Sequence, residues 1–208
     1  MHPGVNMTAL KVLGINGSPR RGGNSDILLG RLLGGVEKEG VKTEAVYLRD
    51  YQYQPCIGCE GCRKDNQCTG LNDGMQLIYP KIIESRGLIM VSPTHNYNVT
   101  AWIKAFIDRL YCFYSYTDDH PRGWSSKLAG QGRKAVIGTI GEQTNPEEAI
   151  GLTLKAMRLP MEALGYEIIG ELPVIGIFHK GKIKEYSETL QKAEEMGTEL
   201  AQRLKRET

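Results

Sequence analysis

The chain has 208 residues, of which 24% are charged, and its formal net charge is +2 at pH 7. This length suits one α/β domain that buries its own core, so no metal is needed merely to fold it. The charge balance gives no basic footprint for nucleic acid, and no apolar run approaches the roughly 18 residues of a membrane span. We therefore expect a single domain over residues 1–208, with neither nucleic acid nor a membrane as partner.

Apolar runs alternate with helical patterns along the whole chain. The predicted strands span residues 11–15, 42–48, 87–91 and 134–140, and a fifth strand is shared by residues 166–169 and 173–177. The predicted helices run from a cap at Asn24 or Ser25 to about Gly40, over residues 98–112, onward from Asn145-Pro146, and from about residue 184 to 203. Strands that alternate with helices predict an α/β fold with a parallel sheet and right-handed crossovers.

Two prolines modify this scheme. Pro80 and Pro160 interrupt helical stretches, and each is expected to end, kink or restart its helix.

Residues 1–7 look like a loose leader with Met7 as a possible true start, and they lack the apolar stretch of a signal peptide. We therefore expect a cytoplasmic protein.

The first predicted strand leads into residues 16–25, Asn-Gly-Ser-Pro-Arg-Arg-Gly-Gly-Asn-Ser, and a helix opens directly afterwards. Backbone N–H groups at a helix N-terminus carry positive partial charge and bind phosphate well. The segment matches neither G-x-G-x-x-G nor G-x-x-x-x-G-K-[ST], which disfavours the usual dinucleotide and triphosphate sites. On composition alone it predicts either a phosphate cradle or an ordinary turn before a capped helix. The candidate phosphate contacts are Ser18, Arg20, Gly22, Asn24 and Ser25.

The third predicted strand leads into a second polar loop that begins at Ser92-Pro93. A proline and an aromatic residue directly after a buried strand form a rigid, partly apolar ledge, which suits a flat ring with polar edges. The alternative is a plain turn with a surface tyrosine. The candidate ring contacts are Pro93, Thr94, His95, Asn96 and Tyr97, with Thr139 and Gly141 in a third loop where the fourth strand ends.

Both loops resemble motifs of one known family. Residues 16–25 resemble the G-S-P-R-x-x-(G)-N-[ST] loop of the NAD(P)H-dependent FMN reductases in the flavodoxin-like superfamily. Residues 92–109 resemble that family's S-P-x-Y-x-x-x-V-x-x-x-x-K-x-F-I-D-R signature, with His95 in place of the usual tyrosine. We assign His95 no catalytic role, and we expect Asp108 and Arg109 to form a structural ion pair or a subunit contact.

The resemblance carries specific implications. It implies a flavodoxin-like three-layer sandwich whose five-stranded parallel sheet has the order 2-1-3-4-5. The first loop is then expected to hold the FMN phosphate, and the second and third loops to line the isoalloxazine. In this superfamily the nicotinamide of NAD(P)H can stack directly on the flavin, so no separate nicotinamide motif is required.

Four of the five cysteines form a run with the spacing C-x₂-C-x₂-C-x₅-C: Cys56, Cys59, Cys62 and Cys68. Four thiolates from one short segment can hold an iron–sulfur cluster, because each iron of a cubane takes one cysteine. Zinc sites usually pair two C-x₂-C units across a longer gap, so the spacing favours a cluster. Zinc and an empty, redox-labile thiol loop remain alternatives. Cys112 lies on a helical apolar pattern and is expected to be packed there.

This run resembles the compact C-x₂-C-x₂-C-x₄₋₇-C motif of the iron–sulfur flavoproteins of anaerobic archaea and bacteria. The resemblance implies a [4Fe–4S] cluster in a cysteine-rich loop at about residues 54–70, inserted after the second strand. The chain is then an oxidoreductase that transfers electrons between FMN and the cluster. One alternative is an NAD(P)H-dependent FMN or quinone reductase without a functional cluster, and another is a non-enzymatic electron carrier or redox sensor.

The expected partners follow from the same resemblance. They are small redox partners, namely NAD(P)H, a quinone or a ferredoxin-like protein. The resemblance also favours a homodimer or homotetramer. The aromatic residues within 110–116 can pack at a subunit interface or form a lid over the flavin.

Overall fold

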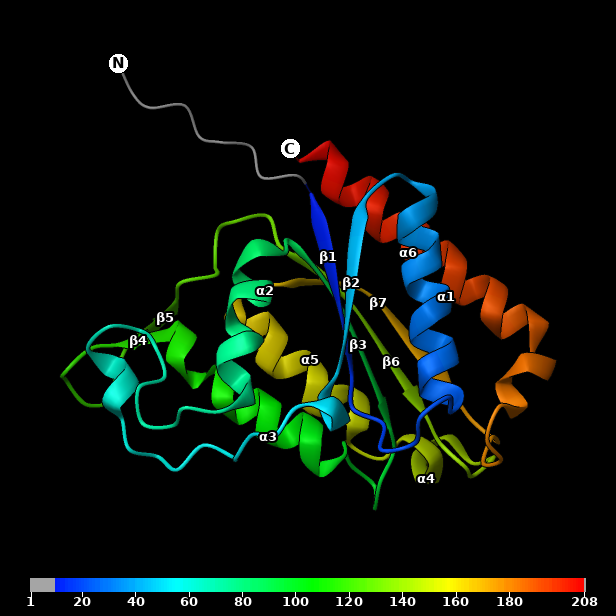
Figure 1. Ribbon diagram of the computed structural model, residues 1–208, viewed down its shortest axis with the longest axis horizontal. Coiled ribbons are helices and arrows are strands. Elements are labelled where there is room, and N and C mark those ends of the chain that lie inside the picture. Colours follow the sequence, from blue (N-terminus) through cyan, green and yellow to red (C-terminus); the bar gives the residue numbers. More distant parts are fainter. Residues whose placement is uncertain (1–9, 208) are drawn as a thin grey trace.

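Five mostly apolar segments pair into a parallel sheet in the computed structural model, which describes residues 10–207 (Figure 1). The strand order is β2-β1-β3-β6-β7. The strands are β1 (Lys11–Asn16), β2 (Lys42–Tyr47), β3 (Gly87–Pro93), β6 (Lys134–Ile140) and β7 (Glu167–Val174). Counted along the chain, these five strands have the expected order 2-1-3-4-5, so the flavodoxin-like fold is confirmed.

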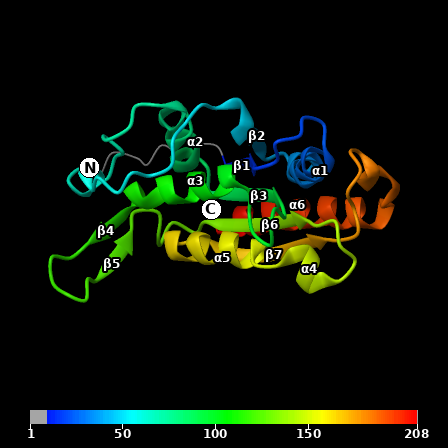
Figure 2. The same cartoon turned by 90° about the horizontal axis from the view of Figure 1, so that it is seen from below.

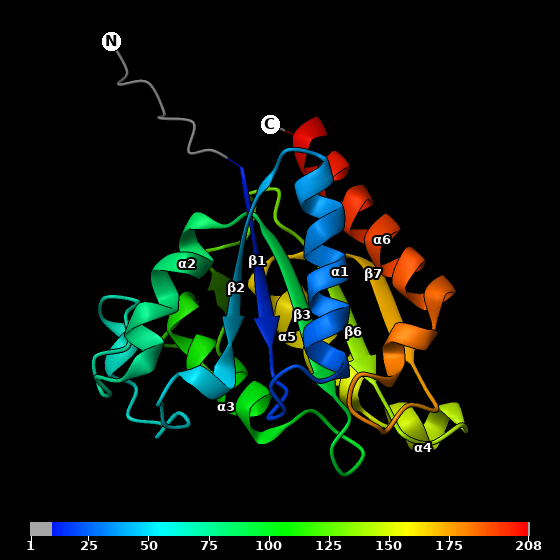
Figure 3. The same cartoon turned by 45° about the vertical axis from the view of Figure 1, so that its right-hand side comes forward.

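Helices cover both faces of this sheet. The long helices α1 (Asn24–Lys38) and α6 (Ser187–Arg206) lie side by side on one face (Figure 3). The other face carries α2 (Tyr79–Glu84), α3 (Ala101–Arg109) and α5 (Thr153–Leu164). The protein has two hydrophobic cores, one on each face of the sheet, and alternate residues of β1 pack into each. Val12 packs with the α1 and α6 side chains, while Leu13 packs with those of α3 and α5.

Two helix starts differ from the prediction. The N-cap of α1 is Gly23, not Asn24 or Ser25, because Asn24 directs its amide to another segment. The helix predicted over residues 98–112 is shorter at both ends. Thr100 caps α3 by accepting a hydrogen bond from the N–H of Ile103, and residues 110–113 form a 3₁₀ turn. In contrast, Asn145 caps the short helix α4 (Pro146–Ile150) as expected.

The prolines behave differently from each other. Pro80 lies in the first turn of α2, where its missing N–H group is harmless, so a helix starts beside the proline, at Tyr79, as expected. Pro160 lies inside α5, which continues to Leu164, so the helix neither ends nor restarts there. The fifth strand is one continuous segment that includes Pro173, which is tolerated because β7 is an edge strand.

A small hairpin was not predicted. It pairs β4 (Tyr114–Tyr116) with β5 (Trp124–Ser126) and projects from the body of the domain (Figure 2). The aromatic residues expected at an interface or lid stack here on one another, with Tyr111 and Tyr116 ring centroids 5.2 Å apart. None of the helices within residues 10–207 has the length and apolar character needed to cross a membrane. The leader expected at residues 1–7 lies outside the described residues.

Candidate functional site

A cleft of about 330 Å³ lies at the carboxyl ends of the central strands, where ligands of doubly wound sheets bind. Its walls come from the loops that follow β1, β3, β6 and β7. Most of the predicted cofactor contacts line it: Ser18, Arg20, Asn24, Ser25, Pro93, Thr94, His95 and Asn96. The remaining ones do not line it: Gly22, Tyr97, Thr139 and Gly141.

The loop after β1 is braced by a largely buried ion pair between Asp26 and Arg49. The two groups form two hydrogen bonds of 2.8 and 2.9 Å. Asp26 also accepts hydrogen bonds from the N–H of Gly22 at 2.7 Å and from the side chain of Asn16 at 3.1 Å. Arg49 donates a further bond to the carbonyl oxygen of Ser18. This brace fixes the loop, and the pattern of residues 16–25 gave no sign of it.

The N-terminus of α1 faces the cleft without a side-chain cap. The N–H groups of Asp26 and Ile27 donate to the carbonyl oxygen of Gly23. This leaves the N–H groups of Asn24 and Ser25 as the ones from which an anion could accept hydrogen bonds, since the first N–H groups of a helix have no partner within it. The residues present therefore fit a phosphate at this point.

The side chain of Asn24 forms two long-range hydrogen bonds that the sequence did not indicate. Its side-chain nitrogen donates to the carbonyl oxygen of His179 at 3.0 Å, and its side-chain oxygen accepts from the N–H of Ile183. The amide thereby holds the segment after β7 against the cleft. This segment adds Phe178 and Lys180 to the lining, and neither was predicted. Both residues come shortly after the predicted fifth strand. The carboxyl end of that strand lies at the same sheet edge as the other loops of the cleft, and this could have indicated them from the sequence.

Arg20 lies at the rim of the cleft. Its guanidinium carbon is 4.9 Å from the centroid of the Phe178 ring, and one of its nitrogens donates to the carbonyl oxygen of the same residue. Partial burial, followed by the positive charge of Arg20, lowers the pKa of His95 below its ordinary 6.5. The His95 imidazole is therefore mostly neutral at pH 7.

The loop after β3 folds into a tight turn. The N–H of His95 donates to the carbonyl oxygen of Asn98 at 2.8 Å, and the reverse bond is 3.1 Å long. The two central residues have positive φ, 50° at Asn96 and 64° at Tyr97, and the latter value is unfavourable for a tyrosine. The Tyr97 side chain is 61% exposed and does not line the cleft, whereas its carbonyl oxygen accepts a bond from Leu152.

The third predicted loop contacts the cleft lining through Thr94. The hydroxyl groups of Thr94, Thr139 and Thr153 form a chain with oxygen separations of 3.2 and 3.1 Å. Gly141 packs on the backbone of Ala149, where a Cβ atom would lie 2.1 Å from the carbonyl oxygen. Neither Thr139 nor Gly141 reaches the cleft surface.

The four-cysteine run borders a second cavity of about 510 Å³. All four of its cysteines line this cavity, together with the buried Cys112 and apolar residues of α3 and α5. Four thiols around one cavity match in number and kind the four cysteine ligands that a cubane cluster needs. Within residues 10–207, however, no three histidine, cysteine or acidic side chains are arranged to hold a metal ion. Burial raises the pKa of the Cys112 thiol to about 12, as expected for a packed cysteine.

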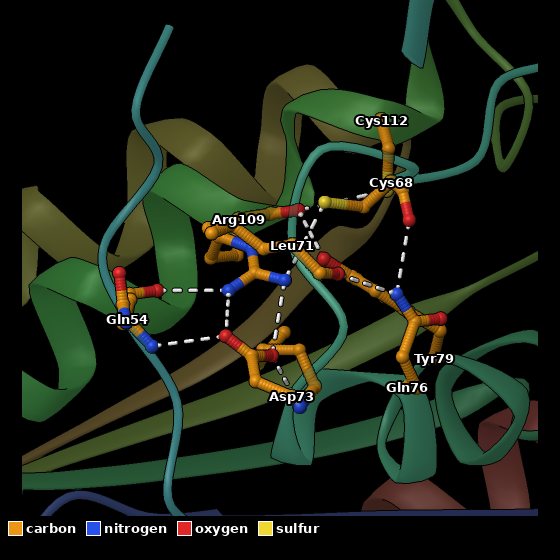
Figure 4. Close-up of polar contacts among 9 residues, drawn as sticks. Gln54, Cys68, Leu71, Asp73, Gln76, Tyr79, Arg109 and Cys112 are labelled. Carbon is orange, nitrogen blue, oxygen red and sulfur yellow. Dashed lines mark hydrogen bonds and ion pairs between the residues drawn. The ribbon is translucent and has the colours of Figure 1, made fainter. Parts of the chain in front are cut away.

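A buried arginine connects this run to the rest of the fold (Figure 4). Arg109, at the end of α3, is 2% exposed and pairs with Asp73 at 2.6 Å. One of its nitrogens lies 3.4 Å from the Cys68 sulfur. Arg109 thus forms an ion pair, as expected, but not with Asp108, which pairs with Lys104 instead.

The sequence of this chain is similar to those of known flavoproteins. A family model described as NADPH-dependent FMN reductase matches residues 10–157. An iron-sulfur flavoprotein of Archaeoglobus fulgidus is 30% identical over 195 residues, which cover 93% of this chain and 80% of that relative. An iron-sulfur flavoprotein of Methanocaldococcus jannaschii is 38% identical over 100 residues, which cover 48% of this chain and 51%, about half, of that relative.

A solved structure agrees in fold. The NAD(P)H:quinone oxidoreductase from Methanothermobacter marburgensis matches with a TM-score of 0.67 at 17% identity. The match covers 91% of this chain and 98% of that structure.

Proposed function

This chain belongs to the NADPH-dependent FMN reductase family, and on that premise we propose that it is a flavin-dependent oxidoreductase with FMN in the cleft at the carboxyl ends of β1, β3 and β6. One observation carries the proposal. The uncapped N-terminus of α1 and the ledge at Pro93–Asn96 face the same cleft, so an anion and a flat ring can be held together.

The phosphate end of the cofactor is assigned to the loop after β1. The N–H groups of Asn24 and Ser25 and the hydroxyl of Ser18 supply donors, while Arg20 and Lys180 supply positive charge. The ring end is assigned to the loop after β3, where Pro93 offers an apolar surface and His95 and Asn96 offer polar atoms. Bound FMN would supply one- or two-electron exchange, and the protein sets its position.

We further propose a [4Fe–4S] cluster on Cys56, Cys59, Cys62 and Cys68. The support is the shared cavity of the four cysteines and the names of the archaeal relatives. Helix α3 joins the two proposed sites, because Thr100 at its start bonds to Gly17 and Arg109 at its end reaches Cys68. Its nine residues rise about 14 Å at 1.5 Å per residue, which sets the scale of the separation along the helix.

Anaerobic purification tests both cofactors at once. We expect one FMN per chain and about four iron and four acid-labile sulfide per chain, the content of one cubane. The ultraviolet–visible spectrum should show flavin bands and a broader absorption that dithionite bleaches. Cys59→Ser should lose the iron and keep the flavin, whereas Cys112→Ser, a matched control in the same cavity, should keep both. Protein with flavin but without iron or sulfide, even after reconstitution, would refute the cluster.

A second candidate function is an NAD(P)H-dependent FMN or quinone reductase without a functional cluster. It is favoured by the side-chain arrangement, because no three histidine, cysteine or acidic side chains within residues 10–207 are placed to hold a metal ion. Rapid reduction of the bound flavin by NAD(P)H at the same rate in wild-type protein and Cys59→Ser would support it. Electron transfer to a ferredoxin-like acceptor, by contrast, should be lost in Cys59→Ser if a cluster carries the electrons.

We also propose a homodimer or homotetramer, and light scattering would distinguish either of these from a monomer.

A further inference from the structure

Arg109 and Asp73 together hold the two ends of the segment that carries the four cysteines. Nη1 of Arg109 donates to the carbonyl oxygen of Gln54 at 2.8 Å and to Oδ2 of Asp73 at 2.6 Å. The same Asp73 oxygen accepts a bond from the N–H of Gln54 at 3.0 Å. Gln54 precedes the first cysteine of the run and Asp73 follows the last, so one ion pair holds both ends of the segment (Figure 4).

The other side of the same guanidinium faces a cysteine. Nη2 of Arg109 donates to Oδ1 of Asp73 at 3.1 Å and lies 3.4 Å from the sulfur of Cys68, within hydrogen-bond reach for sulfur. Burial alone would disfavour the cation, but hydrogen bonding to Asp73 raises the pKa of Arg109, so the group stays charged. Nε of Arg109 is buried and has no hydrogen-bond partner among the described residues.

These contacts have an electronic consequence for a cluster. A hydrogen bond to a ligand sulfur stabilises the more negative, reduced form of a cluster and makes its potential more positive. The Asp73 carboxylate opposes this effect because its negative charge offsets that of the guanidinium. The arginine and the aspartate therefore act on the potential with opposite signs, which a merely structural pair would not do.

We infer that Arg109 is a positioning residue that raises the reduction potential of a cluster on the cysteine run through its N–H bond to Cys68, and that Asp73 lowers it. This inference rests on the proposed cluster. Lysine at position 109 keeps the charge but lacks the fork of donors that reaches Asp73, Gln54 and Cys68 together.

The test is a redox titration of the cluster by electron paramagnetic resonance in anaerobically purified protein. We expect a midpoint more negative than wild type in Arg109→Lys and more positive in Asp73→Asn. Lys104→Gln removes an exposed charge from the same helix and should leave the midpoint unchanged. Iron and sulfide assays of every variant confirm that the cluster is present.

The outcomes separate the inference from the proposed function. Wild-type midpoints in both Arg109→Lys and Asp73→Asn would overturn the inference alone, as would shifts of the same sign in the two variants. If Arg109→Lys loses its cluster, Asp73→Asn alone tests the inference. A midpoint more positive than wild type supports it, and an unchanged or more negative midpoint overturns it. Wild-type protein that takes up no cluster would overturn the cluster proposal, and this inference with it.

Discussion

The hydroxyl of Thr100 donates a hydrogen bond of 2.8 Å to the carbonyl oxygen of Gly17, which ties the start of α3 to the loop after β1. The N–H of Gly17 in turn donates to Val91 of β3 at 2.9 Å. The two loops assigned to the cofactor are therefore fixed to each other by residues outside the lining of the cleft.

Gly17→Ala should disturb this junction. A Cβ atom at Gly17 would lie 2.1 Å from Cγ1 of Ile103 and 3.0 Å from the Thr100 hydroxyl. Such overpacking costs about 1–3 kcal/mol, which urea unfolding would measure, and FMN should bind more weakly. Gly34→Ala, which meets no atom within 4 Å and lies inside α1, is the control and should stabilise by up to about 1 kcal/mol. Equal stability of Gly17→Ala and wild type would contradict the close packing.

Asn24→Ala should loosen the wall of the cleft. The substitution leaves the carbonyl oxygen of His179 and the N–H of Ile183 without the Asn24 amide, and a buried group left unpaired costs about 1–3 kcal/mol. We expect a lower unfolding free energy. We also expect a lower affinity for FMN, measured by titration through the quenching of flavin fluorescence on binding. Asn72→Ala, at an exposed asparagine, should change neither. Unaltered FMN affinity in Asn24→Ala would show that the segment after β7 does not shape the site.

Tyr97→Gly should stabilise the protein. Tyr97 has a φ of 64°, a region that costs most residues about 1–3 kcal/mol and glycine little. The greater freedom of glycine in the unfolded chain offsets part of the gain, so we expect roughly 1 kcal/mol in thermal unfolding. Tyr97→Ala also removes the ring but keeps the strained backbone, and it should not be stabilised. A gain of equal size in both variants would point to the side chain instead.

The sheet and its ligand-binding edge could be predicted from the sequence, because buried parallel strands leave continuous apolar runs such as residues 87–91. The hydrogen-bond and ion-pair partners of single polar groups could not be predicted from the sequence. Asp26 and Arg49 lie 23 residues apart, and Arg109 and Asp73 lie 36 apart. Asn24 looked like a cap because its local pattern is the same whether its amide caps α1 or bonds to His179. Such long-range choices depend on the folded chain.

Acid should weaken the Asp73–Arg109 pair. Burial by itself raises the pKa of Asp73, but hydrogen bonds from Arg109 and from backbone N–H groups lower it below its ordinary 3.8. The unfolded state then binds the proton more readily, so the stabilisation is complete well above pH 3.8 and is lost as the pH falls through the folded-state pKa. The difference in urea unfolding free energy between wild type and Asp73→Asn should therefore shrink below pH 3.8. A difference that is constant from pH 7 to pH 3 would contradict this assignment.

We propose above that the cleft holds FMN with its phosphate at the N-terminus of α1. The most direct measurement is a fluorescence titration of cofactor-free protein with FMN and, separately, with riboflavin, which lacks the phosphate. Two charge-assisted hydrogen bonds of about 1.5 kcal/mol each correspond to a preference of about a hundredfold. We predict that FMN binds at least that much more tightly than riboflavin, with one FMN per chain. Equal dissociation constants for the two flavins would contradict the account.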